Sequence, residues 1–95
     1  MMLRLEARPG KEEEVERLLM SSLAGVRKEA GTKAWFAIRF GRSTFGVFDV
    51  FADETGRNAH LAGDVAARLK NAASELLTGP PEIVPVDILA SKLPR

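Results

Sequence analysis

The sequence contains no cysteine, and only one histidine and one tryptophan, among its 95 residues. Without cysteine, disulfides, thiolate metal sites and cysteine nucleophiles are excluded, and the absence fits a reducing compartment. No apolar run approaches the roughly 20 residues that a membrane-spanning helix needs. The first residues also lack the charged and apolar regions of a secretory signal. We therefore expect a cytoplasmic protein without a membrane segment.

A strong charge of one sign is also missing. Lys and Arg number 14 and Asp and Glu 13, so the formal net charge is +1. Nucleic-acid binders usually carry a clear basic excess, and we expect no nucleic-acid partner. Hydrophobic residues make up 45% and charged residues 28% of the chain, which is ordinary for a globular protein. The length predicts one domain over residues 1–95 with a thin core.

Hydrophobic periodicity predicts four strands and two main helices. The strands are expected at residues 2–8, 33–40, 44–51 and 82–90, and the helices at residues 11–30 and 65–77. A loop at residues 53–58 runs into a short helix, and a loose tail is expected at 91–95. Gly31 is expected to end the first helix in the left-handed conformation. Pro85 places the last strand at an edge or at a bulge.

The predicted order is βαββαβ, which indicates an α+β fold of the ferredoxin-like type with a four-stranded antiparallel sheet. Right-handed crossovers would put both helices on the same face of this sheet. The other face would then have no helix to cover it.

Alternation along the strands divides their side chains into two sets. One set is apolar or glycine and is expected to pack on the helices: Leu3, Leu5, Ala7, Phe36, Ile38, Phe40, Gly46, Phe48, Val50, Val84, Val86 and Ile88. The other mixes apolar and charged groups: Met2, Arg4, Glu6, Trp35, Ala37, Arg39, Phe45, Val47, Asp49, Phe51, Ile83, Pro85, Asp87 and Leu89. Exposed to water, this mixed face would exceed the apolar patch usual for a monomer. We expect a homodimer packed sheet to sheet, with a ligand pocket between the sheets.

Several short segments resemble the antibiotic biosynthesis monooxygenase family, whose members are small dimeric α/β-barrel proteins. They are residues 8–12, 29–32, 48–53 and 59–61, which occur in the family's order along most of the chain. The resemblance implies a homodimeric barrel and a cofactor-independent oxygenase that acts on phenolic or quinol-like substrates. The family often has Glu and Trp where this chain has Asp49 and Phe51.

Such an oxygenase needs a base to deprotonate the substrate and a group to stabilise the resulting anion. His60 is a candidate base because its ordinary pKa is about 6.5; the alternative is a helix-terminal residue with a satisfied hydrogen bond. Asp49 is a second candidate because apolar neighbours raise the pKa of a carboxyl; the alternative is an ion pair with Arg39 or Arg4. Arg39 is the candidate anion stabiliser, or a structural partner of an acidic residue.

Aromatic side chains of the mixed face are candidates for the walls of the substrate site. Trp35, Phe45 and Phe51 could stack a substrate ring, with Arg4 beside them, or they could fill a dimer interface. No metal-ligand spacing is found in the sequence. The leading hypothesis is a cofactor-independent monooxygenase of a small aromatic molecule, bound between the sheet and the helices or a partner sheet. Alternatives are a non-catalytic small-molecule-binding dimer and a purely structural dimer.

Overall fold

The computed structural model describes residues 1–94 and contains four strands and three helices. Along the chain these are β1 (Met2–Glu6), α1 (Glu12–Val26), β2 (Thr32–Arg39), β3 (Thr44–Phe51), α2 (Glu54–Leu61), α3 (Asp64–Leu76) and β4 (Glu82–Val84). The strands form one antiparallel sheet in the order β2-β3-β1-β4. The predicted ferredoxin-like βαββαβ fold is confirmed.

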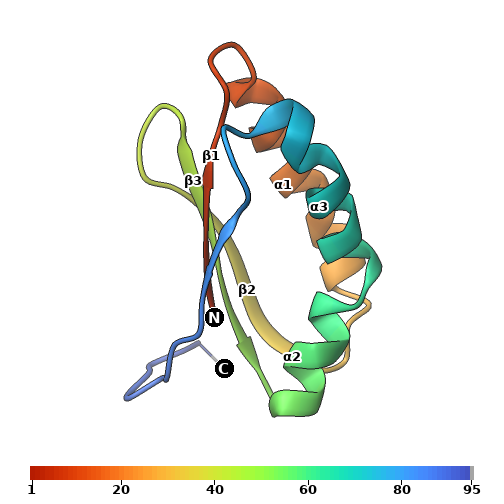
Figure 1. Ribbon diagram of the computed structural model, residues 1–95. Coiled ribbons are helices and arrows are strands. Elements are labelled where there is room, and N and C mark those ends of the chain that lie inside the picture. Colours follow the sequence, from red (N-terminus) through yellow and green to blue (C-terminus); the bar gives the residue numbers. More distant parts are fainter. Residues whose placement is uncertain (95) are drawn as a thin grey trace.

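All three helices lie on one side of the sheet, as Figure 1 shows. The core fills the space between the two layers and includes Leu5, Val15, Leu19, Phe45 and Leu77. These side chains come from β1, α1, β3 and the end of α3, so the core ties both helical crossovers to the central strands. No helix within residues 1–94 is both long and apolar enough to cross a lipid bilayer.

The strand register corrects the predicted face assignment for three of the four strands. Directly paired residues share a face, and one row across the sheet is Ala37, Val47, Leu3 and Ile83. The next row is Phe36, Phe48, Met2 and Val84. Leu3 and Val47 are buried in the core, whereas Phe36 is 47% exposed. The prediction was therefore correct for β1 and inverted for β2, β3 and β4.

The helix-facing side of the sheet consequently holds Trp35, Arg39, Phe45 and Asp49. The uncovered side, which we call the outer face, holds Arg4 and Glu6 together with apolar groups. The apolar members of the outer face are Met2, Phe36, Ile38, Phe40, Phe48, Val50 and Val84. Both sides of β2 and β3 carry large apolar residues, and for this reason alternation alone did not fix the phase.

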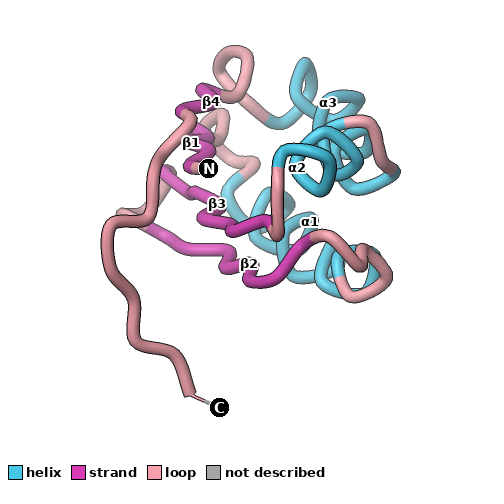
Figure 2. Tube along the Cα trace, turned by 90° about the horizontal axis from the view of Figure 1, so that it is seen from below, coloured by secondary structure: helices cyan, strands magenta, loops and turns pink. Residues whose placement is uncertain are grey.

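The end of the chain also differs from the prediction. The ladder of β4 stops at Val84, because Pro85 has no backbone N–H to donate. Residues 85–94 form no strand, and Figure 2 shows them on the side of the sheet away from the helices. Of the predicted tail at 91–95, Arg95 lies outside the described residues.

Gly31 does not adopt the left-handed conformation expected of it. Within residues 1–94 only Gly10 has a positive φ, of 86°. Gly31 instead lies against Gly56 of α2, so close that a Cβ on Gly56 would be 2.8 Å from the Gly31 carbonyl oxygen. Helix α1 ends earlier than predicted, at Val26. The two glycines let α2 approach the turn between α1 and β2.

Gly56→Ala is expected to lower the free energy of unfolding by about 1–3 kcal/mol, since the methyl would overlap backbone atoms that cannot rotate away. Urea denaturation measures the change. Gly41→Ala is the matched control, because a Cβ there meets no atom within 4 Å. Equal stability of the two variants would contradict the close approach of α2.

Candidate functional site

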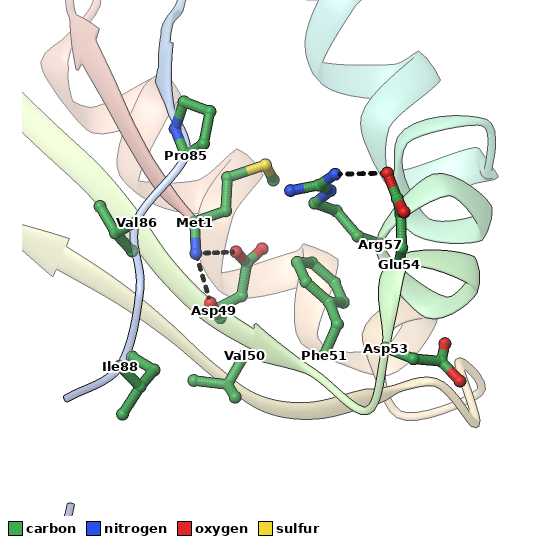
Figure 3. Close-up of a pocket in the computed structure, with 10 residues that line it drawn as sticks. All are labelled: Met1, Asp49, Val50, Phe51, Asp53, Glu54, Arg57, Pro85, Val86 and Ile88. Carbon is green, nitrogen blue, oxygen red and sulfur yellow. Dashed lines mark hydrogen bonds and ion pairs between the residues drawn. The ribbon is translucent and has the colours of Figure 1, made fainter. Parts of the chain in front are cut away.

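A cleft of about 400 Å³ opens at the sheet end where β1 begins. Beyond Asp49, β3 still pairs with β2 but no longer has β1 on its other side. The start of α2 and the segment after β4 form the other walls. The lining residues, drawn in Figure 3, are Met1, Asp49, Val50, Phe51, Asp53, Glu54, Arg57, Pro85, Val86 and Ile88. We call this space the Asp49 cleft.

Asp49 is the unusual residue of this cleft. It is only 1% exposed, and neither carboxylate oxygen has a hydrogen-bond partner in the described chain. Two groups that can carry a positive charge lie nearby. The Met1 ammonium is 3.7 Å from Oδ1, and Nε2 of the His60 ring, which is charged only if protonated, is 3.5 Å from Oδ2. Buried polar groups are normally satisfied, so the unsatisfied Asp49 carboxylate is an exception that marks this end of the sheet as a candidate site.

Burial raises the pKa of the Asp49 carboxyl above its ordinary value. The Met1 ammonium, and His60 whenever its ring is protonated, oppose the rise in part, and the nearby Glu29 adds to it. A carboxylate with a raised pKa is a stronger base than one in water. The raised pKa therefore makes Asp49 a candidate base.

The raised pKa of Asp49 predicts how stability changes with pH. Because the folded state binds this proton more tightly than the unfolded state, ionisation of Asp49 destabilises the fold. The stability of the wild type relative to Asp49→Asn is therefore expected to be constant below pH 3.8, the ordinary pKa. It should then fall as the pH rises through the folded pKa. Urea denaturation from pH 3 to pH 8 tests this, with the exposed Asp87→Asn as control, and a relative stability that rises with pH contradicts it.

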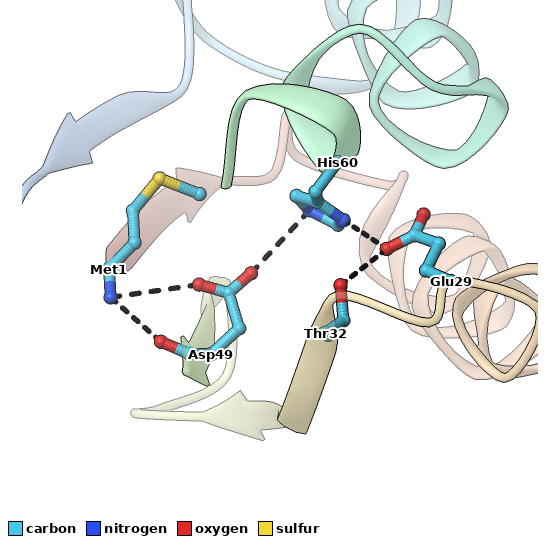
Figure 4. Close-up of polar contacts among 5 residues, drawn as sticks. All are labelled: Met1, Glu29, Thr32, Asp49 and His60. Atoms are coloured by element: carbon cyan, nitrogen blue, oxygen red, sulfur yellow. Dashed lines mark hydrogen bonds and ion pairs between the residues drawn. The ribbon is translucent and has the colours of Figure 1, made fainter. Parts of the chain in front are cut away.

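His60 lies in the last turn of α2 and is 6% exposed. Its Nδ1 is 2.6 Å from Oε1 of Glu29, and the Thr32 hydroxyl donates to the same oxygen at 2.8 Å. Figure 4 shows the resulting line of polar groups from Met1 through Asp49 and His60 to Glu29. A second hollow of about 270 Å³ lies on the Glu29 side and is lined by both His60 and Glu29. We call it the Glu29 hollow.

The local sequence explains how α2 carries His60 into this position. Asp53 caps the helix, its side chain accepting a hydrogen bond from the Gly56 N–H at 2.9 Å. Gly56 and His60 are four residues apart and form the buried face of α2. The contact of Gly56 with Gly31 presses this face against the turn that holds Glu29. The Phe51 ring packs 5.3 Å from the His60 ring, between centroids.

Three of the residues singled out from the sequence come together. Asp49 and Phe51 line the cleft, and His60 lies directly behind Asp49. The alternative interpretation of Asp49, an ion pair with Arg39 or Arg4, is wrong, because the groups next to its carboxylate are His60 and the Met1 ammonium. His60 does have the satisfied hydrogen bond of the alternative interpretation, but its partner is a carboxylate.

The other four lie elsewhere. Trp35 packs partly buried against the core, and Phe45 is a core residue, 2% exposed. The Arg39 guanidinium lies 3.6 Å from Glu16 and 4.8 Å from the centroid of the Phe45 ring. Arg4 is on the outer face, 5.2 Å from the Phe40 centroid. None of these four residues lines the Asp49 cleft, whereas Phe51, the third predicted wall residue, does.

Two residues of the site were missed. Arg57 lines the cleft, with its guanidinium 3.3 Å from the exposed Glu54, and Glu29 holds His60. The spacing of Arg57 and His60 on one short helix after the third strand was a signal that could have joined Arg57 to the site. Among residues 1–94 no group of three or more His, Asp or Glu side chains is arranged to hold a metal ion.

Several solved structures of other proteins are similar to this chain. The chain is 54% identical to the NE2512 protein of unknown function from Nitrosomonas europaea, covering 99% of this chain and 91% of that one, with a TM-score of 0.95. A second protein of that organism, called a "putative antibiotic biosynthesis monooxygenase", is 11% identical and covers 94% of this chain and 96% of its own, with a TM-score of 0.84. One of the same description from Caulobacter crescentus is 21% identical, covers 94% and 87%, and has a TM-score of 0.80. No family model and no curated protein matches the chain.

Proposed function

We propose that this chain is a cofactor-independent monooxygenase of small phenolic or quinol-type molecules. The chain belongs to the same family as the NE2512 protein of Nitrosomonas europaea and has the antibiotic biosynthesis monooxygenase-like fold. The observation that carries the proposal is the Asp49 carboxylate, buried and without a hydrogen-bond partner at the wall of a cleft of about 400 Å³. The names of the structural neighbours support the reaction class.

Each part of the cleft has a role in this chemistry. Asp49 accepts the hydroxyl proton of the substrate, and His60 behind it stabilises the charge changes. Arg57 takes the place that Arg39 was expected to hold and stabilises the substrate anion with its guanidinium. The Phe51 ring offers an apolar surface for the substrate ring.

The reaction balances without an external reductant. Once deprotonated, the phenolate gives one electron to O₂, and the phenoxyl radical and superoxide combine to form a C–O bond at a ring carbon. The peroxide is protonated, the ring carbon loses its proton, and the O–O bond breaks to release hydroxide. The products are a quinone and water, so the substrate supplies all four electrons that reduce O₂. Asp49 takes up and returns the hydroxyl proton.

The assembly we propose is a homodimer formed through the outer face of the sheet. No helix covers this face (Figure 1), and Phe36, Phe40 and Val84 on it are 47%, 51% and 40% exposed. A continuous apolar surface of this kind marks an interaction site more often than a free surface.

Oxygen consumption with a panel of phenols and quinols tests the function. We expect uptake above autoxidation that survives a metal chelator. In ¹⁸O₂ one labelled atom should enter the product and the other should enter water. Hydrogen peroxide as the reduced product would indicate an oxidase instead. Ligand binding without uptake across the panel would contradict catalysis and favour the small-molecule-binding dimer.

A further inference from the structure

The geometry points to Glu29 as the positioning residue of the site. It holds His60 in the tautomer whose unprotonated Nε2 faces Asp49, and it connects the Asp49 cleft to solvent for proton exchange. This role rests on the proposed function, because it concerns the same proton that Asp49 takes from the substrate.

The contact between His60 and Glu29 fixes the tautomer. The distance of 2.6 Å from Nδ1 to Oε1 is shorter than the usual N–H···O separation of about 2.9 Å and is typical of a charge-assisted bond. An ionised carboxylate can only accept a hydrogen bond, so Nδ1 carries the proton. In the neutral ring the lone pair is then on Nε2, the atom 3.5 Å from Oδ2 of Asp49.

Glu29 itself is held firmly in the turn after α1. The Thr32 hydroxyl donates to the same oxygen as His60, at 2.8 Å. The backbone N–H of Glu29 donates to the Val26 carbonyl at 2.9 Å, and its carbonyl accepts from the Thr32 N–H at 3.2 Å. A carboxylate fixed in this way can orient a neighbouring ring at little entropic cost.

Exposure rises step by step along the three side chains. Those of Asp49, His60 and Glu29 are 1%, 7% and 19% exposed. Asp49 lines the cleft, whereas His60 and Glu29 line the Glu29 hollow on the other side. The other charged groups near this path are the Met1 ammonium beside Asp49 and, in the hollow, Lys28 and Asp64. The three side chains therefore connect the Asp49 cleft to the Glu29 hollow.

The step moves one proton and no electrons. Asp49 takes the proton as the substrate O–H bond breaks and passes it to Nε2 of His60. The Nδ1 proton moves to Glu29 and from there to water in the hollow. The reverse sequence delivers a proton to the hydroxide released later and restores the starting tautomer.

Imidazole ¹⁵N NMR tests the tautomer directly, because His60 is the only histidine and its ring signals need no further assignment. In the wild type we expect that a neutral ring carries its proton on Nδ1. Glu29→Met, which removes the acceptor, should lose this preference. Glu29→Gln should keep it, because the amide carbonyl still accepts a hydrogen bond. Glu75→Met and Glu75→Gln, at an exposed site of α3, are matched controls and should behave as wild type.

Kinetics with a substrate identified by oxygen uptake test the proton path. Glu29→Met should lower kcat at least about 100-fold and Glu29→Gln at least about tenfold, with KM changed less than about threefold, since Glu29 does not line the cleft. An unchanged tautomer in Glu29→Met, or kcat of both variants within twofold of wild type, would overturn the inference. If the wild type consumes no oxygen, the proposed function fails, and the NMR result still decides whether Glu29 positions His60.

Discussion

Asp49→Asn is expected to lower the rate of oxygen uptake by about 10²–10⁴-fold, the range that a positioned general base contributes. Asparagine has nearly the same size and shape as aspartate, and its carbonyl can still accept a hydrogen bond from the substrate hydroxyl. It cannot take the proton. Substrate binding should therefore persist while turnover is lost, and KM should change much less than kcat.

The measurement is the initial rate of oxygen consumption with the best substrate of the panel, supported by ligand titration of both proteins. Asp87→Asn is the control, because it removes an exposed carboxylate from the segment after β4 without touching the cleft lining. Uptake by Asp49→Asn within a few fold of wild type would exclude Asp49 as the base. If substrate binding and oxygen uptake were both lost, the carboxylate would mainly anchor the substrate.

The element order could be predicted because each signal was local. Alternation marked the strands, the repeat of Val15, Leu19 and Val26 marked α1, and the chemistry of proline placed the last strand at an edge of the sheet. The right-handed crossover rule then left one arrangement of helices on the sheet. These inferences need no knowledge of which residues meet across the fold.

The orientation of β2 and β3 could not be obtained in this way. Phe36 and Trp35 are adjacent and both large, and so are Phe48 and Val47, so hydrophobicity does not say which member of each pair faces the helices. Charge misled the assignment as well. Asp49 was taken to mark the solvent or partner side, whereas it is 1% exposed on the helix side. A buried aspartate breaks the general rule that charged side chains face solvent, and such exceptions are expected at functional sites.

The site was predictable only in part for a related reason. Asp49 and His60 could be named from their chemistry, but Glu29 gains its role from a contact across 31 residues of sequence. That contact depends on Gly31 and Gly56 lying backbone to backbone, which no periodicity reveals. Arg39 was chosen because it belonged to the predicted mixed face, and Arg57, which lies on α2, was not considered.

Phe36→Glu is expected to convert the proposed homodimer into monomers. Phe36 is 47% exposed and lies in the apolar row that crosses all four strands with Phe48, Met2 and Val84. Burying a phenylalanine contributes about 1.5–3 kcal/mol, and a two-fold interface contains each residue twice. The loss is then roughly 3–6 kcal/mol, which raises the dimer dissociation constant by about 10²–10⁴-fold, before the cost of burying the carboxylates is counted.

Sedimentation equilibrium over a range of concentrations measures the dissociation constant. Met20→Glu is the matched control, because Met20 is 69% exposed on α1, in the helical layer opposite the outer face. Circular dichroism of both variants confirms that the fold persists. A wild type that stays monomeric at micromolar concentration, or a Phe36→Glu dimer as tight as that of Met20→Glu, would exclude the outer face as the interface. Oxygen uptake by a folded Phe36→Glu monomer would then show whether the Asp49 cleft, built within one chain, works without its partner.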